Sequence, residues 1–417
     1  MNQKSKWYGP KQIGVMILTA ILMLFCACIV GGNNNTVFPA FSEAYGWDLD
    51  LMHVISGIGA MMLGVGVLVF SQLLKKVSVK KVVIFTLLLS GALILLQAYV
   101  KNFIVFIIAM PLLGFLGGGY ERVGSTVITA NWWPTKKGVV LGFTTMGIVA
   151  MNVVYVPFMP KLFASLGLNT GYGIVGIIFI ILAIICIFVY KETPEEVGEY
   201  PDGDPNYYEE GSAREVVEAM KHYKSPFTVK RLLSIKETWL IGFGSAIAYM
   251  ACMSFVASAI PTLLGYGYEM SFASTFFAVC GIIAFVGSFL FGLLDQKAGP
   301  KKAFIVFFIV MIVGFIFALF MKHSAIIVWI TGIIMFMGQG AIANLTISYV
   351  TTIFGRWDYS AAWSLIGFVY AIGGGAGIMI VGLFSNPVTM QIFAIVCLVI
   401  GLIMIILSKD KLIGKKG

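Results

Sequence analysis

Residues 103–133 read FIVFIIAMPLLGFLGGGYERVGSTVITANWW, an apolar run long enough to cross a bilayer, with one acid and one base near its middle. Glu121 and Arg122 follow a glycine triplet at 117–119, and no other acid or base lies as deep in a hydrophobic segment. A charge near the bilayer midplane is costly, so it normally faces a bundle interior or a water-filled cavity. The pair is therefore the predicted functional centre.

The composition is that of a polytopic membrane protein. Of the 417 residues, 59% are hydrophobic and 11% are charged, whereas a soluble domain has about 25% charged residues. A minimum of about 20 apolar residues per span predicts twelve membrane-spanning helices. They cover residues 12–37, 51–74, 82–100, 103–133, 138–160, 171–190, 237–265, 270–294, 303–321, 325–354, 360–384 and 387–408.

The distribution of the basic residues behind the net charge of +9 indicates the orientation of the protein in the membrane rather than nucleic-acid binding. Of the 28 Lys and Arg residues, 24 fall in the termini and the even-numbered connections, and only Lys101, Lys161 and Lys322 fall in the odd-numbered ones. The positive-inside rule then places both termini and the long middle loop in the cytoplasm. We expect a monomeric, multi-pass protein of the plasma membrane, in a bacterium the cytoplasmic membrane, whose partners include the lipid bilayer and no nucleic acid.

Two halves of six spans each, residues 1–190 and 237–417, flank a polar cytoplasmic linker at 191–236. The halves repeat each other at an offset of 221 residues. The aligned positions are Lys80 and Lys81 with Lys301 and Lys302, Gly117 and Gly119 with Gly338 and Gly340, and Trp133 with Phe354. Repeats in the same orientation imply a pseudo-twofold axis along the membrane normal, with a cavity between two six-helix bundles. The predicted fold is thus an all-α membrane protein with the layout of a transporter.

The turn after the eighth predicted span reads GLLDQKAGPKK at 292–302. It resembles the Gly–apolar–Asp–base–Gly–base–base turn of the major facilitator superfamily, with its acid, Asp295, one position early. The first half departs further, because Ser71 and Ser78 replace both glycines and Lys75 stands at the acid position. Together with the twelve spans, the resemblance covers nearly the whole chain. It implies that superfamily's fold, secondary transport, and a gate role for Asp295.

Three short stretches resemble the oxalate/formate antiporter and monocarboxylate transporter branch of that superfamily. They are NWWPTKKG at 131–138, LSIKETW at 233–239 and GNNNTVF at 32–38. Lys136 and Lys137, in the first of these, are predicted gate residues.

One departure from this branch bears on the substrate. The branch generally places a base in the eighth span, and its oxalate carriers place a second in the eleventh. Here residues 285–289 and 365–369 read FVGSF and LIGFV, without a charge. A dicarboxylate needs two buried positive partners, since an unpaired buried carboxylate is very costly. Oxalate is therefore disfavoured.

Arg122 is the predicted anchor for a substrate carboxylate, because its planar guanidinium matches a carboxylate by two parallel hydrogen bonds. The alternative is a purely structural role, in which Glu121 or backbone carbonyls neutralise the arginine. Successive helix residues point about 100° apart, so at most one of the two faces a cavity directly. Glu121 is the only interior carboxylate and is the candidate for a carried proton, or else it is only the counter-charge of the arginine.

Other polar and aromatic residues in the spans are predicted to contact substrate, although helix-to-helix hydrogen bonds and packing are alternatives for each. They are Asn35, Tyr120, Asn152, Tyr249, Gln339, Asn344, Trp363 and Tyr370. The sequence shows no metal-ligand cluster, no cofactor motif and no nucleophile with a base. We therefore expect no bound metal or cofactor and no enzymatic activity.

The predicted function is secondary transport of a monovalent organic anion of the monocarboxylate type, together with a proton, by alternating access through one central site. Three alternatives stay open: an anion antiporter, a carrier of a bulky amphipathic carboxylate such as a steroid or aromatic acid, and a non-transporting membrane sensor.

Overall fold

The computed structural model describes residues 9–74, 76–133, 137–208 and 225–413, and every regular element within these ranges is a helix. Within these described ranges, eleven helices are long and apolar enough to cross a membrane, or twelve if one bent pair counts as a span. They are Pro10–Val30 (α1), Leu49–Leu73 (α3), Val79–Tyr99 (α4), Phe103–Trp132 (α5, η2 and α6), Leu168–Val189 (α9), Lys236–Gly265 (α12), Met270–Ala298 (α13), Pro300–Ala318 (α14), Ala325–Gly355 and Ala361–Leu383 (both in α15), and Pro387–Leu407 (α16). The predicted all-α fold is confirmed.

The bent pair takes the place of the fifth predicted span. The helices α7 (Lys137–Val153) and α8 (Tyr155–Leu166) are bent by 43° where they meet. The remaining elements are short. They are η1 (Gly32–Asn35), α2 (Val37–Tyr45), η3 (Pro194–Val197), η4 (Pro201–Gly203), α11 (Val229–Leu233) and η5 (Met321–His323).

The first span ends earlier than predicted, at Val30 instead of residue 37. The side-chain amide of Asn34 donates to the carbonyl oxygens of Val30 and Gly31, both at 3.1 Å. Asparagine side chains compete with the backbone for helical hydrogen bonds. The chain accordingly passes into the 3₁₀ turn η1 before it continues as α2.

The helix α15 holds two spans separated by a break at Gly355. This residue has a φ of 78° and a ψ of 164°, a conformation that a residue with a Cβ rarely adopts. The two flanking spans, Ala325–Gly355 and Ala361–Leu383, match the tenth and eleventh predicted spans within two residues.

The chain divides into two compact units. Unit 1 takes the residues up to Ile29, Met62–Ala150, and Leu162 onward into the middle loop; unit 2 takes Val30–Met61, Met151–Lys161 and the residues from Ser225 onward. The units cut across the sequence halves, because α3 and the bent fifth span contribute to both. The division into bundles 1–190 and 237–417 with a linker at 191–236 stays a prediction.

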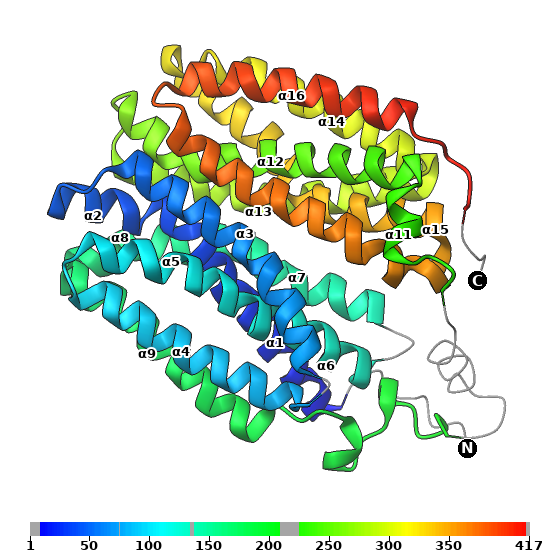
Figure 1. Ribbon diagram of the computed structural model, residues 1–417. Helices are drawn as coiled ribbons and strands as arrows, with labels where there is room; N and C mark the ends of the chain where they lie inside the picture. Colours follow the sequence, from blue (N-terminus) through cyan, green and yellow to red (C-terminus); the bar gives the residue numbers. More distant parts are fainter. Residues whose placement is uncertain (1–8, 75, 134–136, 209–224, 414–417) are drawn as a thin grey trace. The chain divides into compact units, whose positions relative to one another are not determined.

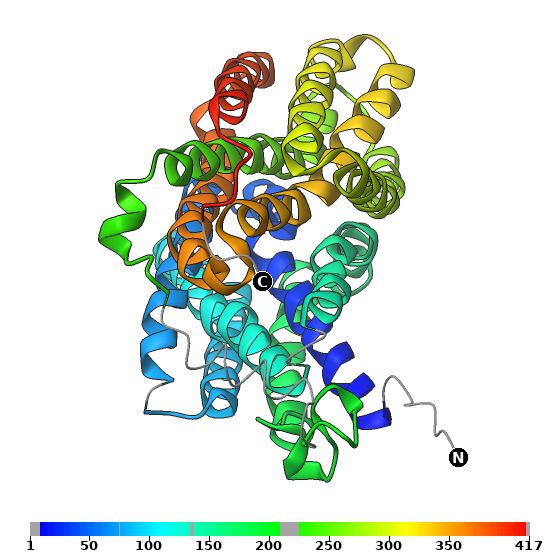
Figure 2. The ribbon, with the colours of Figure 1, turned by 90° about the vertical axis from the view of Figure 1, so that its right-hand side faces the viewer.

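Within unit 1, α4 lies alongside α9 (Figure 1). The two helices approach closely at Gly91 and Gly176, where a Cβ on either glycine would lie within 3 Å of the other's carbonyl oxygen. Within unit 2, α12 packs along α15, and α14 lies beside α16 (Figures 1 and 2). Small residues at such crossings are typical of helices packed in a membrane.

The first part of the middle loop is bound to the ends of unit 1 helices. Lys11 Nζ donates to the carbonyl of Val197 at 2.6 Å, and Trp132 Nε1 donates to that of Lys191 at 2.9 Å. Residues 191–208 therefore belong to unit 1 and are hydrogen-bonded to its helix ends at Lys191 and Val197.

Candidate functional site

The fourth span contains a π-helical turn, η2, which runs from Gly118 to Val123 between α5 (Phe103–Gly117) and α6 (Gly124–Trp132). A π-turn widens the backbone ring from i→i−4 to i→i−5 bonds, is rare, and occurs frequently at functional sites. Glu121 and Arg122 both lie within this turn. The charged pair is thus placed on an irregular backbone inside an otherwise regular helix.

Three successive glycines, residues 117–119, allow neighbouring helices to approach the π-turn closely. A Cβ on Gly117 would lie 2.9 Å from the Cys26 sulfur of α1, and one on Gly118 would lie 2.7 Å from the backbone of Gly66 in α3. Gly119 faces α4, where its Cβ would lie 2.7 Å from a side-chain carbon. Backbone atoms cannot move aside as side chains can, so the contact at Gly118 tolerates only glycine.

The two charged residues of the turn lie in different environments. Glu121 is 1% exposed, whereas the side chain of Arg122 is 43% exposed. Arg122 Nε lies 2.8 Å from Glu121 Oε2, but this ion pair lacks hydrogen-bond geometry, and Glu121 Oε1 has no hydrogen-bond partner among the described residues. Glu121 is therefore buried, whereas the side chain of its ion-pair partner Arg122 is partly exposed.

Thr126 extends the exposed face of Arg122 by one helical turn. It is four residues further along, and it is exposed as well, so the two side chains lie on the same face of the fourth span. Sequence reasoning missed this residue, although its spacing from Arg122 was a usable signal. Tyr120, in contrast, is 1% exposed and packs edge-on against Phe179. Its predicted contact with substrate stays a prediction.

Asn35 is fully buried in unit 2, where both ends of its amide bind the backbone of α12. Its Nδ2 donates to the carbonyl of Val256 at 2.7 Å, and its Oδ1 accepts from the amide of Ile260 at 3.1 Å. These two groups are an i, i+4 pair, the pair that bonds within a regular helix. The Asn35 side chain thus hydrogen-bonds to the backbone of a helix that comes from the other half of the sequence.

The other predicted amides, unlike Asn35, form hydrogen bonds with side chains in unit 2. Asn152 Nδ2 donates to Gln339 Oε1 at 3.0 Å, and Asn344 Nδ2 donates to Ser288 Oγ at 2.7 Å. Asn152 is buried, Gln339 is partly buried and Asn344 is exposed. The predicted amides are therefore distributed over three separate contacts.

The structure brings three predicted aromatic residues together in unit 2. The rings of Tyr249 and Tyr370 stack at 4.4 Å with an interplanar angle of 7°, and Trp363 lies 6.1 Å from Tyr370. Tyr359 extends the row by stacking on Trp363 at 5.8 Å. Tyr249, Trp363 and Tyr370 are each partly exposed. We call these four residues the aromatic row.

The predicted gate residues are only partly described. Asp295 lies near the end of α13, partly exposed, and its carbonyl accepts from the amide of Gly299 at 2.8 Å. Lys136 lies outside the described residues, and Lys137 begins α7 with a side chain that also lies outside them. Their gate roles stay predictions. Among the described residues, no group of three or more His, Cys, Asp or Glu side chains could hold a metal ion.

Comparison with known proteins identifies the family to which this chain belongs. The sequence matches the family model described as Major Facilitator Superfamily over residues 20–378. The chain belongs to this superfamily. The resemblance inferred from the span pattern and the turn at 292–302 is confirmed at the level of the superfamily, and the chain is a membrane transporter rather than an enzyme.

Relatives within and around the superfamily are distant. The MFS-type transporter pytF of Aspergillus terreus is 24% identical over 298 residues, which cover 70% of this chain and 93% of the relative. A crystal structure of a bacterial homologue of the human lysosomal transporter Spinster, inward-facing and occupied, has a TM-score of 0.75 and 15% identity, covering 96% of this chain and 97% of that one.

A crystal structure of a mutant of the peptide transporter POT has a TM-score of 0.72 and 15% identity, with coverage of 98% and 96%. At this identity the structural matches show the fold alone. They carry no information about the substrate of this chain.

Proposed function

We propose that this transporter carries a singly charged organic anion across the membrane together with a proton, by alternating access. The observation that carries the proposal is the arrangement on the π-turn, where the Arg122 guanidinium is exposed and Glu121 is buried behind it. An exposed guanidinium in the middle of a span is expensive unless it meets water or an anion. It offers a carboxylate two parallel hydrogen bonds.

Charge balance on the pair favours one anion and one proton. Ionised Glu121 and Arg122 sum to zero, so a bound anion leaves the pair with one negative charge. Protonation of Glu121 restores neutrality, and an uncompensated buried charge is very costly. The anion and the proton are therefore expected to move together. An anion antiporter, the open alternative, would exchange one anion for another while Glu121 stays ionised.

The aromatic row in unit 2 supports a substrate with an apolar or aromatic body. Tyr249, Trp363 and Tyr370 are partly exposed, and aromatic pairs contribute about 0.5–1.5 kcal/mol beyond their buried area. A bulky amphipathic carboxylate, such as a steroid or aromatic acid, uses such a surface, whereas acetate or lactate gains little from it. This observation favours the bulky acid as the second candidate, beside the short monocarboxylates to which the branch resemblance points.

The topology is part of the proposal. The distribution of Lys and Arg favours cytoplasmic termini and a plasma-membrane location, and we propose a monomer as the transporting form. A dicarboxylate substrate is not proposed, because Arg122 is the only base in the sequence that lies away from the ends of a span.

Counterflow in proteoliposomes tests the proposal. Vesicles containing the purified protein are loaded with one unlabelled acid, and uptake of the same acid in labelled form is followed for acetate, lactate, benzoate and a bile acid. We expect counterflow of at least one singly charged acid, with little for oxalate and none for a neutral analogue such as benzyl alcohol. Counterflow confined to cations or neutral solutes would contradict the proposal.

A further inference from the structure

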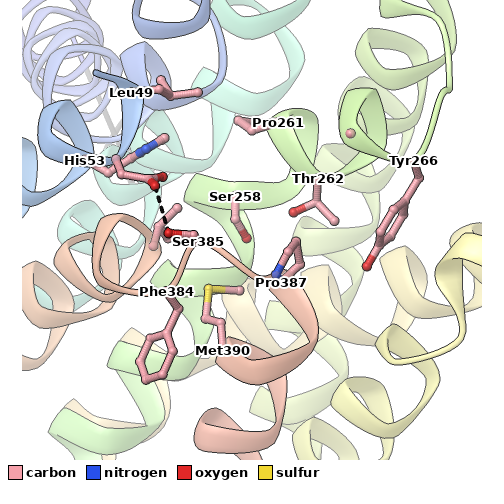
Figure 3. Close-up of a pocket in the computed structure, with 13 residues that line it drawn as sticks. Leu49, His53, Ser258, Pro261, Thr262, Tyr266, Phe384, Ser385, Pro387 and Met390 are labelled. Carbon is pink, nitrogen blue, oxygen red and sulfur yellow. Dashed lines mark hydrogen bonds between the residues drawn. The ribbon is translucent and has the colours of Figure 1, made fainter. Parts of the chain in front are cut away.

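Unit 2 contains a cavity of about 340 Å³, formed by the first turns of α3, the end of α12 and the turn between α15 and α16 (Figure 3). This volume lies at the lower end of the range for sites that bind small molecules. The start of α3, the end of α12 and the turn between α15 and α16 all lie at odd-numbered connections between spans, whereas the middle loop is an even-numbered connection. The cavity therefore lies at the opposite end of the spans from the middle loop. It is separate from the π-turn, which belongs to unit 1.

His53 lines this cavity with unsatisfied ring nitrogens. It is 1% exposed, and neither nitrogen has a hydrogen-bond partner among the described residues. The backbones of Asn34 and Leu49 lie near the imidazole. Leaving a buried polar group without a partner is unfavourable in free energy. A ligand that pairs with the imidazole would recover part of this energy.

Asp50 places a carboxylate beside His53 in the same cavity. The two residues are three positions apart on α3 and lie on one face of the helix. Asp50 Oδ2 accepts a hydrogen bond from Ser385 Oγ at 3.2 Å (Figure 3). Among the residues that the structure describes, no lysine or arginine lines the cavity beside this carboxylate.

The other polar groups add hydrogen-bond acceptors. The Ser385 hydroxyl donates to Asp50, and the Ser258 hydroxyl donates to the carbonyl of Ser254 at 2.7 Å. A hydroxyl has only one hydrogen to donate, so both oxygens present lone pairs to the cavity. A neutral imidazole also has one acceptor nitrogen. The wall therefore suits a positively charged hydrogen-bond donor.

We infer that this cavity binds a small organic ammonium ion. Its N–H groups donate to the carboxylate of Asp50 and to the acceptor nitrogen of His53, while its alkyl body contacts apolar lining residues such as Leu49 and Met390. A metal ion fits this wall poorly, because one carboxylate and one imidazole provide fewer than three strong ligands. Tyr266 also lines the cavity, and aromatic rings attract cations.

Thermal unfolding of the purified full-length protein tests this site directly. Butylammonium chloride is titrated against sodium chloride at equal ionic strength, and against butanol as the neutral analogue of the same size. We expect a saturable rise in Tm with butylammonium alone. Equal stabilisation by sodium chloride or by butanol, or no stabilisation, overturns the inference without requiring any variant.

Variants then locate the binding. Asp50→Asn removes the charge at constant size, and we expect it to weaken butylammonium binding at least tenfold. Glu269→Gln, an equal charge change at an exposed position near the same end, is expected to leave binding unchanged. Undiminished binding to Asp50→Asn contradicts the assignment. Acid counterflow without butylammonium is a separate measurement, so failure of this site leaves the proposed function intact.

Discussion

Arg122 Nε lies 2.8 Å from Glu121 Oε2, yet the arginine side chain is 43% exposed and the glutamate is buried. The π-turn makes this possible, because it redirects successive side chains while keeping the two charged groups within contact distance. The buried partner lowers the cost of placing the arginine in the membrane. In the proposed function, this exposed guanidinium binds the anion.

The proton role of Glu121 predicts a separable defect. Glu121→Gln keeps the size of the side chain and removes its charge, so anion exchange should continue while accumulation driven by a pH gradient is lost. Counterflow and pH-jump uptake in the same vesicles measure the two properties, with Glu269→Gln as the matched control. Normal pH-driven accumulation by Glu121→Gln would assign the glutamate a structural role only.

Asn35 is predicted to stabilise unit 2 through its two bonds to α12. Asn35→Ala should lower the free energy of unfolding by only about 1 kcal/mol, because Val256 and Ile260 can then bond to each other as in a regular helix. Asn35→Asp should cost more, since a carboxylate cannot donate to the Val256 carbonyl and is buried there.

Thermal unfolding in detergent compares these two variants with the same changes at Asn206, which is exposed in the middle loop. A larger loss for Asn35→Ala than for Asn35→Asp would show that the amide hydrogen bonds are not what the position requires.

Gly118 is predicted to be intolerant of any side chain. Gly118→Ala places a methyl group 2.7 Å from the backbone of α3, and overpacking of this kind typically costs about 1–3 kcal/mol. Gly14→Ala is the matched control, because no atom lies within 4 Å of the added methyl and alanine in a helix gains about 0.5–1 kcal/mol over glycine. Tm should fall for the first variant and hold or rise for the second. Equal Tm values would refute the close approach of α3.

The aromatic row predicts a defect that depends on the substrate. Tyr370→Leu removes the stack with Tyr249, so KM should rise roughly twofold to tenfold for aromatic acids, the equivalent of about 0.5–1.5 kcal/mol, and should change little for acetate. Tyr268→Leu removes a comparable stack with Phe272 and serves as the control. An equal change for both acids would mean that the row only packs the helices.

The membrane spans could be predicted from the sequence because bilayer thickness sets a length that composition alone reveals. Phe103–Trp132 and Pro387–Leu407, for example, match their predicted limits within one residue. Three of the four residues of the aromatic row, Tyr249, Trp363 and Tyr370, were predicted to contact substrate, which stays a prediction. Neither their mutual stacking nor the place of Tyr359 in the row could be read from the sequence.

Other features depend on contacts that a linear sequence does not display. Gly66 and its neighbours in α3 approach Gly118 of the π-turn closely, which is a property of packing rather than of local propensity. The partner of Asn35 lies 221 positions away at Val256, and no spacing rule identifies it. His53 gave no signal because it lies near the end of a span, where a polar residue is ordinary.

Transport by Arg122→Lys tests the central claim most directly. Lysine keeps the positive charge but lacks the planar guanidinium that makes two parallel hydrogen bonds to a carboxylate. We predict that kcat/KM for uptake of the transported acid falls by about tenfold to a hundredfold, the loss of about 1.5–3 kcal/mol expected for a charged hydrogen bond. Arg231→Lys, an exposed change in α11, should leave uptake unaltered. Full uptake by Arg122→Lys would contradict the assignment of this guanidinium as the anion anchor.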